Sequence, residues 1–349
     1  MNESEYIKRC LQLAAQGREK AAPNPMVGAV IVRNGKIIGE GYHTECGFAH
    51  AEVEAIQSVA DQSLLKDSTM YVSLEPCSHF GKTPPCAKLI IEKEIPRVVI
   101  GTLDPFPAVS GNGVRMLQEA GVEVKVGVLE EECRILNKAF FCYLENKRPY
   151  IVLKWAQTKD GFIDKIRAKG EKPHPTPISN ELTRCHVHKL RSEVQSILVG
   201  TNTAINDNPS LTVRFWSGNN PTRLLLDRSL RVPEDSVLFD GNVPTLVFTE
   251  KEMENRPNCE YVKIAFDRNP IFEIVEQLYE RCIQSLLVEG GSQLLQSFID
   301  NDLWDEIQIE VADVTFGSGV AAPHFDAKPD SVERVCNSEM YHFTRQTSL

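Results

Sequence analysis

The feature that most constrains this chain is a set of metal-binding residue types placed far apart in the sequence. His50 and Glu52 stand in the run HAEVEAIQ, and Cys77 and Cys86 follow in YVSLEPCSHFGKTPPCAK. A zinc ion that does hydrolytic work takes three protein ligands and keeps one position open for water. His50, Cys77 and Cys86 supply three ligands, and a carboxylate remains to carry protons. The fold must therefore bring residues 50, 77 and 86 together.

The local context of these residues agrees with such a site. HAEVEAIQSVA has apolar residues near helical spacing, so His50 and Glu52 are expected in the first turn of a helix. TMYVSLEP is typical of a short buried strand and places Cys77 at its carboxyl end. Two prolines precede CAKLIIEKEI, so Cys86 is expected at a helix start, where the dipole favours a thiolate.

Each of these residues also has a simpler interpretation. Taken alone, His50 could be a surface or capping histidine, and the two cysteines could be buried thiols or a disulfide. A structural zinc site is a further alternative, because such sites close the fourth position with a protein ligand, here Cys46 or His79. The order of the four groups, with a proline before the first cysteine, favours a catalytic zinc centre.

Composition narrows the class of protein. At 349 residues, with 42% hydrophobic and 25% charged residues, the chain suits two globular domains. No run approaches the ~20 apolar residues of a membrane span, and no apolar signal segment is evident. Ten irregularly spaced cysteines then indicate a reducing, cytoplasmic setting. A net charge of −10 argues against a nucleic-acid partner, whose phosphates usually require a basic face.

Strand and helix patterns alternate through the first half of the chain. Asn2 and Glu5 can form a capping box for a first helix, and the Asn-Gly pair at 34–35 predicts a hairpin. The alternation that follows predicts a layered α/β domain with a partly parallel sheet. The run 131–148 is typical of one closing helix, and residues 147–149 suit a domain boundary.

The second half predicts another α/β domain. Residues 165–177 are rich in proline and lysine and suit a loop, and 178–194 suit a helix capped by Ser179. Residues 195–214 suggest a buried strand, a polar loop and a turn. Residues 285–300 suggest a strand, a glycine turn and a helix, which can hold a phosphate on free backbone amides. A G-x-G-x-x-G motif is absent, so a Rossmann domain is not indicated.

The string EPCSHFGKTPPC and the upstream PNPMVGAVIV closely resemble bifunctional riboflavin-biosynthesis enzymes. These join a diaminohydroxyphosphoribosylaminopyrimidine deaminase to a 5-amino-6-(5-phosphoribosylamino)uracil reductase. Eight residues separate the two cysteines here, whereas zinc deaminases commonly carry P-C-x-x-C, with two residues between them. The resemblance covers essentially the whole chain. It implies an α/β protein, with a cytidine-deaminase-like three-layer domain over 1–146 and a dihydrofolate-reductase-like domain over 149–349.

The same resemblance suggests substrate contacts in the first domain. In the family these come from the Asn of PNP, the His before the zinc helix, and the His and Lys between the two cysteines. An aspartate after RVVIGTL lies near the ribose phosphate. The matching positions here are Asn24, His43, His79, Lys82 and Asp104. Simpler roles are a turn cap for Asn24 and a solvated loop charge for Lys82.

In the second domain, the reductase assignment rests on the resemblance alone. Its motifs match at 154–161, 190–191, 207–214 and 289–291. By that match the substrate is held by Arg191, Leu211, Arg214 and Glu289. NADPH is held by Lys154, Ala156, Thr203, Asp207, Gly291, Ser292, Gln293, Leu294, Leu295, Gln296 and Ser297. Arginines suit a ribose phosphate because their forked donors pair with its oxygens. The simpler interpretation of both arginines is a solvated charge.

One segment departs from the family. Many members carry G-E-S-x-W before the helix at 178–194, and the Trp contacts the cofactor. Here HPTPIS stands in a lengthened segment, with Pro177 about where the Trp would be. A deaminase with a degenerate reductase domain is therefore one alternative. Another is a nucleic-acid base deaminase with a C-terminal binding module, which the acidic charge disfavours.

Together these observations predict a cytoplasmic enzyme that uses Zn²⁺ and NADPH in turn. Its first domain deaminates a phosphoribosylated pyrimidine, with Glu52 as the catalytic residue. Its second domain reduces the ribosyl side chain of the product to a ribityl chain. We expect a homo-oligomer with small-molecule substrates, and neither a membrane nor a nucleic acid as partner.

Overall fold

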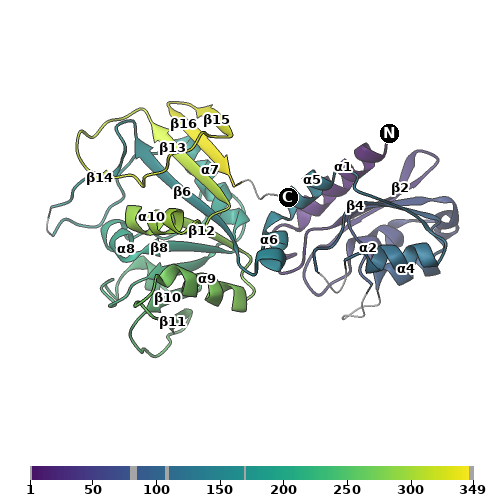
Figure 1. Ribbon diagram of the computed structural model, residues 1–349, viewed down its shortest axis with the longest axis horizontal. Coiled ribbons are helices and arrows are strands. Elements are labelled where there is room, and N and C mark those ends of the chain that lie inside the picture. Colours follow the sequence, from purple (N-terminus) through teal and green to yellow (C-terminus); the bar gives the residue numbers. More distant parts are fainter. Residues whose placement is uncertain (1, 79–84, 107–109, 169, 346–349) are drawn as a thin grey trace. The chain divides into compact units, whose positions relative to one another are not determined.

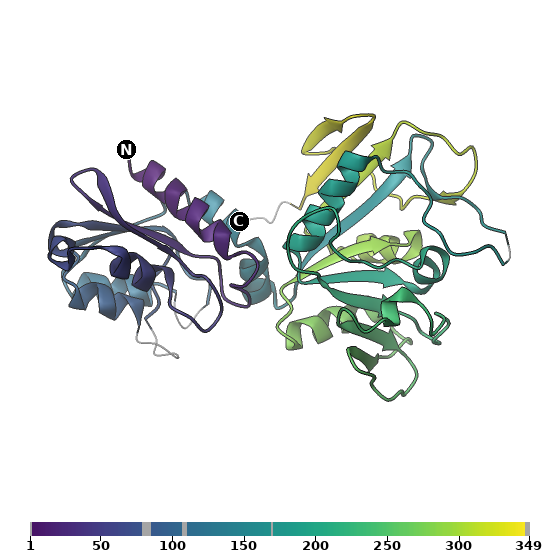
Figure 2. The ribbon, with the colours of Figure 1, turned by 180° about the vertical axis from the view of Figure 1, so that it is seen from behind.

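The computed structural model describes residues 2–78, 85–106, 110–168 and 170–345. The chain divides into two compact units, Met1–Lys147 and Arg148–Leu349. Figures 1 and 2 show them from opposite sides. Among the helices of the described residues, none combines the length and the apolar character that crossing a membrane requires.

The first unit is built on a five-stranded sheet in the order β2-β1-β3-β4-β5. Its strands are β1 (Gly28–Arg33), β2 (Lys36–Tyr42), β3 (Thr69–Leu74), β4 (Arg97–Thr102) and β5 (Glu123–Val126). The predicted hairpin joins β1 to β2, with Asn34 and Gly35 both at positive φ. Strands β3, β4 and β5 run parallel, so their carboxyl ends share one edge of the sheet.

Helices cover both faces of this sheet and make three layers (Figure 1). Val30 and Val32 of β1 point to the face covered by α1 (Glu3–Ala14), while Ala29 and Ile31 point to the other face. That other face carries α2 (Ala51–Ser58), α3 (Cys86–Glu92) and α4 (Asn112–Glu119). Short 3-10 helices lie at Ala15–Gly17 and Gln62–Asp67. The capping box predicted at the start of α1 is present.

The prediction of one closing helix over 131–148 is wrong. The structure has α5 (Glu130–Leu136) and α6 (Lys138–Asn146), separated at Asn137. The Asn137 side chain accepts from the backbone N–H of Met26 (2.8 Å) and donates to its carbonyl (2.9 Å). This pairing with a distant backbone fixes a non-helical residue inside an otherwise helical pattern.

The second unit is built on a nine-stranded sheet in the order β11-β10-β9-β8-β12-β6-β13-β16-β15. Its strands are β6 (Tyr150–Thr158), β8 (Ser196–Gly200), β9 (Thr222–Leu226), β10 (Thr245–Thr249), β11 (Cys259–Lys263), β12 (Ser285–Gly290), β13 (Glu306–Ala312), β15 (Ser331–Val335) and β16 (Ser338–Thr344). The seven from β11 to β13 run parallel, β16 pairs antiparallel with β13, and β15 pairs antiparallel with β16. A separate pair joins β7 (Phe162–Asp164) to β14 (Val320–Ala321).

The parallel strands of this unit are buried by helices. These are α7 (Glu181–Glu193), α8 (Thr201–Asp207), α9 (Pro270–Glu280) and α10 (Ser292–Asp300), with a 3-10 turn at Val237–Phe239. The central strands are nearly continuous apolar runs, as expected for parallel strands that are covered on both faces. Helices α8 and α10 begin directly after β8 and β12, so both start at the carboxyl edge of the sheet.

Two local predictions in this unit are wrong. Asn180, not Ser179, caps α7 by accepting from the N–H of Thr183 (3.0 Å), and the Ser179 hydroxyl instead contacts Glu310. The polar loop expected after β8 is the helix α8. Its Asn- and Asp-rich composition favours turns in isolation. In the folded unit, the Asn206 carbonyl near its end accepts hydrogen bonds from residues outside the helix.

Candidate zinc and dinucleotide sites

Three side chains of the first unit converge on one point. Cys77 follows β3 and Cys86 is the first residue of α3, as their local patterns predicted. His50, expected in the first turn of a helix, is the N-cap of α2, one residue before the helix begins. The sulfurs of Cys77 and Cys86 lie 3.5 and 3.3 Å from His50 Nδ1, and all three atoms lie within 4.8 Å of one another. Ligand atoms around a tetrahedral zinc ion are roughly 3.6 Å apart. The cluster therefore fits Zn²⁺.

The two cysteines are electrostatically coupled. A hydrogen bond from the Cys86 side chain, together with the contact to His50, lowers the pKa of Cys77 to about 4. The same contact with Cys77 raises the pKa of Cys86. The backbone N–H of Cys86 also donates to the Cys77 sulfur (3.3 Å). One thiolate is thus stable at neutral pH, and a divalent cation would stabilise the second.

Glu52 lies in the first turn of α2 and is only 3% exposed. Burial raises the pKa of its carboxyl group to about 7, and the neighbouring Cys77 charge contributes. A carboxyl group with a pKa in this range can both accept and release a proton near neutral pH. The arrangement therefore offers a proton carrier beside three metal-ligand atoms.

Asn24 and His43 lie next to this cluster. His43 Nδ1 donates to the carbonyl of Ala49 (3.0 Å), so its Nε2 is left to accept from the Asn24 amide (3.1 Å). The His43 ring lies edge-on to that of His50, with centroids 5.5 Å apart. Burial lowers the pKa of His43, which keeps the ring neutral. The structure thus brings two of the expected substrate residues to the metal cluster.

The other three expected substrate residues of this unit are His79, Lys82 and Asp104. His79 and Lys82 lie outside the described residues. Asp104 is partly buried after β4, and its carboxylate accepts from the N–H of Phe106 (2.8 Å). Its own N–H donates to Glu75 (3.2 Å), two residues before Cys77. This contact connects the Asp104 loop to the cysteine segment.

Glu75 is a site-building residue that the sequence reasoning missed. It is 4% exposed, and its carboxylate accepts from four backbone N–H groups within 2.9 to 3.2 Å. These belong to Asp104, Gly111, Gly113 and Val114. The glutamate in the string EPC was the available signal, but its partners lie 29 to 39 residues away. Their contact could not be inferred locally.

The second unit contains a cavity of about 1140 Å³ at the carboxyl edge of its parallel strands. This is the usual place for ligands in open α/β sheets. Most of the residues expected to bind substrate or cofactor line it: Lys154, Ala156, Arg191, Thr203, Asp207, Arg214, Glu289, Gly291, Ser292, Gln293, Leu294, Leu295 and Ser297. Leu211 and Gln296 are not among its lining residues. Leu211 is buried, and the Gln296 amide donates to Asp300 (2.8 Å).

Arg191 and Glu289 form a bidentate ion pair in this cavity. Arg191 Nε lies 2.8 Å and Nη2 lies 2.6 Å from the two carboxylate oxygens. Both side chains are largely buried, so the solvated-charge interpretation of Arg191 is wrong. Burial alone would raise the pKa of Glu289, but Arg191 lowers it below its usual value. The buried Lys154, whose pKa burial lowers, lies near this pair.

His188 is a second residue that the sequence reasoning missed. It is buried in α7, lines the cavity, and accepts from the N–H of Arg214 through Nδ1 (2.9 Å). Burial and the charges of Arg191 and Arg214 lower its pKa to about 4. The ring is therefore neutral and holds the backbone of an expected substrate residue. Two histidines in TRCHVHKLR were the only sequence signal.

The turn between β12 and α10 has the shape of a phosphate cradle. Gly290 has φ +136°, a conformation that L residues rarely adopt. A Cβ atom added at Gly291 would lie 3.1 Å from Thr203 Oγ1, so α8 approaches this backbone closely. The first N–H groups of α10 have no partners within the helix. The turn and the cavity beside it therefore fit a dinucleotide phosphate.

Comparisons with known proteins cover both units. The RibD C-terminal domain family matches residues 149–347, and the cytidine and deoxycytidylate deaminase zinc-binding region matches residues 1–102. The zinc cluster lies in the second of these ranges and the cavity in the first. The predicted α/β class, with a deaminase-like and a reductase-like domain, is confirmed.

Curated relatives are similar over about nine tenths of this chain. The riboflavin biosynthesis protein RibD of Aquifex aeolicus is 43% identical over 91% of this chain and 89% of its own length. That of Synechocystis is 38% identical over 93% and 87%. A solved diaminohydroxyphosphoribosylaminopyrimidine deaminase/5-amino-6-(5-phosphoribosylamino)uracil reductase from Thermotoga maritima has a TM-score of 0.88 at 39% identity, covering 98% of both chains.

Proposed function

The chain belongs to the RibD family of riboflavin biosynthesis proteins, and on that premise we propose how its residues carry out two successive reactions. It is a bifunctional enzyme, a zinc-dependent deaminase joined to a reductase. In the proposal, the first unit acts on 2,5-diamino-6-(5-phosphoribosylamino)pyrimidin-4(3H)-one and releases ammonia. The second reduces the ribosyl side chain of that product to a ribityl chain.

In the first unit, His50, Cys77 and Cys86 would hold Zn²⁺, which supplies Lewis acidity when bound. Glu52 takes a proton from the attacking water and passes protons to the ring and to the leaving ammonia. Asn24 and His43 would orient the pyrimidine. The observation that carries this assignment is the convergence of three ligand atoms within 4.8 Å, beside a carboxyl group whose pKa is about 7.

In the second unit, Arg191 and Arg214 would bind the ribose phosphate of the substrate. Glu289 would accept hydrogen bonds from the pyrimidine amino groups, and Leu211 would belong to the substrate site, as the resemblance implies. NADPH supplies the hydride. Its phosphates would lie against the start of α10 and beside Thr203. The ion pair between Arg191 and Glu289 holds both groups in place before substrate arrives.

The cavity lining favours NADPH over NADH. At the end of β9, Asp227 is 1% exposed, and its carboxylate accepts from Thr201 (3.1 Å) and from the N–H of Val232 (2.8 Å). Asp227 is therefore buried and already hydrogen-bonded, and it is not available to receive a ribose 2′-hydroxyl. The cavity is lined instead by Arg228 and Arg231, whose charges suit a 2′-phosphate.

We expect the double substitution Arg228→Gln, Arg231→Gln to raise the KM for NADPH about 10- to 100-fold, since a hydrogen bond to a charged group contributes about 1.5–3 kcal/mol. The KM for NADH should change little. Steady-state kinetics with both cofactors checks this. Equal losses with the two cofactors would contradict a role at the 2′-phosphate.

The overall function is tested with purified protein and the diaminopyrimidinone ribosyl phosphate. We expect ammonia release without NADPH, and NADPH oxidation only after deamination has supplied the second substrate. The product should carry a ribityl chain, which mass spectrometry distinguishes by two added hydrogens. Ammonia release with no oxidation of NADPH would support a deaminase with a degenerate reductase domain. An absence of both would reject the proposal.

We also propose a cytoplasmic location and a homo-oligomeric state. The ten cysteines of the chain are irregularly spaced and do not form the pattern of a disulfide framework, which supports a reducing compartment. The net charge of −10 supports small-molecule rather than nucleic-acid partners. Light scattering on the purified protein tests the oligomeric state, with a mass above the 39.1 kDa of one chain expected.

A further inference from the structure

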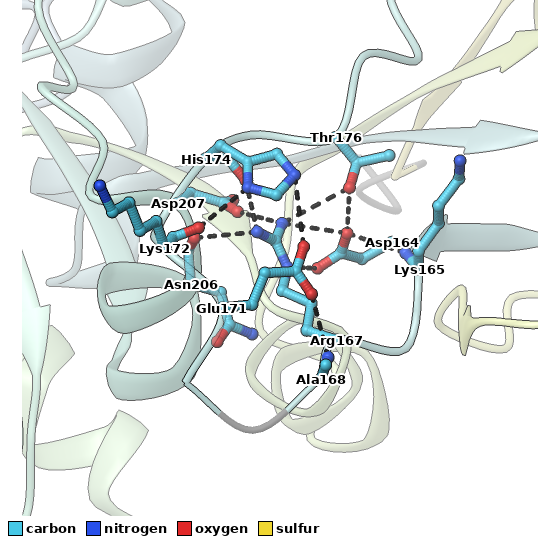
Figure 3. A network of polar contacts seen from close by, with 10 residues as sticks. All are labelled: Asp164, Lys165, Arg167, Ala168, Glu171, Lys172, His174, Thr176, Asn206 and Asp207. Carbon is cyan, nitrogen blue, oxygen red and sulfur yellow. Dashed lines mark hydrogen bonds and ion pairs between the residues drawn. The ribbon is translucent and has the colours of Figure 1, made fainter.

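A partly buried charge cluster is centred on Arg167 (Figure 3), and three of its partners line the dinucleotide cavity. Arg167 Nε and Nη2 bind both carboxylate oxygens of Asp164, at 3.0 and 3.1 Å. Nη2 also binds Asp207 at 2.9 Å and the Thr176 hydroxyl at 3.4 Å. Thr176 in turn donates to Asp164. We call these four side chains the Arg167 cluster.

Arg167 also ties two backbone segments together. Its Nη1 donates to the carbonyls of His174 (2.5 Å) and Asn206 (3.0 Å), and the N–H of His174 donates to Asn206 as well (2.9 Å). Asn206 lies in the last turn of α8, where carbonyls lack partners inside the helix. A cation at this end also opposes the negative end of the helix dipole. Arg167 therefore fixes residues 174–176 against the end of α8.

Helix α8 connects the Arg167 cluster to the proposed phosphate turn. Asp164, Thr176 and Asp207 line the cavity. Thr203 lies one helical turn before Asp207, and its hydroxyl faces Gly291 at the start of α10. One short helix thus spans the distance from the Arg167 cluster to the turn that would hold the cofactor phosphates.

The cluster contains one cation and two carboxylates. Arg167 is 11% exposed, and its two carboxylate partners are 17% and 29% exposed. Burial raises the pKa of Asp207 to about 6, and the charge of Asp164 adds to this, while Arg167 opposes it. Without the guanidinium, two carboxylates would face the same cavity. A dinucleotide brings several negative charges of its own, and repulsion in a partly buried site is weakly screened.

We propose that Arg167 is a positioning residue of the cofactor site, which offsets the charges of Asp164 and Asp207 and holds α8 so that an anionic dinucleotide can bind. The inference rests on the proposed reductase function of the second unit. Arg167 lies in the lengthened segment before α7, which does not match the family motif. The inference gives this segment a role in cofactor binding.

The test measures NADPH binding directly, by fluorescence titration of the full-length protein, so that it does not depend on turnover. Arg167→Met is expected to weaken NADPH binding at least about tenfold. The matched control, Lys165→Met, removes an exposed positive charge from the same segment and should bind within about twofold of wild type. Deamination by the first unit should be unchanged in both variants.

A second variant separates charge from folding. Arg167→Met leaves two uncompensated carboxylates, and adding Asp164→Asn returns the cluster to the single net negative charge of the wild type. This double variant should recover most of the lost affinity. Affinity unchanged in Arg167→Met, or a loss that Asp164→Asn does not reduce at all, would overturn the inference.

The same titration distinguishes a failure of the reductase function from a failure of the role proposed for Arg167. A wild-type protein that binds NADPH but never oxidises it would refute the reductase function, and the variants would still decide the role of Arg167. A wild-type protein that does not bind NADPH at millimolar concentration would refute both. Thermal unfolding with and without NADPH gives an independent readout of the same affinities.

Discussion

Replacing Glu52 by glutamine is expected to slow deamination about 10²- to 10⁴-fold, the usual contribution of a positioned acid–base group. Glutamine keeps the size of the side chain but cannot accept and release a proton. Glu52 is 3% exposed, and burial raises its pKa to about 7, so the wild-type group is suited to both steps. Ammonia release from the pyrimidine substrate measures the effect.

Glu54→Gln is a matched control, because Glu54 lies on the same helix two residues further along and is only partly buried. It should retain deamination within a fewfold of wild type. Zinc content should remain at one ion per chain in both variants, since His50, Cys77 and Cys86 are unchanged. Full deamination by Glu52→Gln would reject the mechanism, whereas loss of zinc would make Glu52 a ligand.

Replacing Arg191 by methionine is expected to destabilise the second unit by about 3–5 kcal/mol, the usual cost of breaking a buried ion pair from one side. The side chains of Arg191 and Glu289 are 11% and 13% exposed, so Glu289 would be left charged and unpaired. Reduction should be lost at the same time, because both groups line the cavity. Denaturant unfolding and NADPH oxidation measure the two effects.

The exposed pair of Lys159 and Asp313, whose side chains are 69% and 67% exposed, provides the control. Lys159→Met should change the free energy of unfolding by at most about 1 kcal/mol. Combining Arg191→Met with Glu289→Leu should restore much of the stability without restoring reduction, because neither member of the pair is then left charged without the other. A stability change below about 1 kcal/mol in Arg191→Met alone would contradict the buried pairing.

Short-range features could be predicted from the amino-acid sequence. The capping box of Asn2 and Glu5 and the turn at 34–35 depend on residues within one or two turns of each other. His50, Cys77 and Cys86 were recognisable because ligand chemistry is a property of residue type, and because each stands at the end of a strongly patterned element. A catalytic zinc ion needs three protein ligands at one point, so the fold was expected to bring these three side chains together.

Only the tertiary structure decided which distant polar groups meet. The break at Asn137 depends on a backbone 111 residues away, and the partner of Arg191 is 98 residues away. The partners of Glu75 and Arg167 could not be inferred from neighbouring residues, because each side chain binds amides, carbonyls or carboxylates on other elements. The physical reason is that a buried polar group must find a partner, and long-range folding determines which partner is within reach.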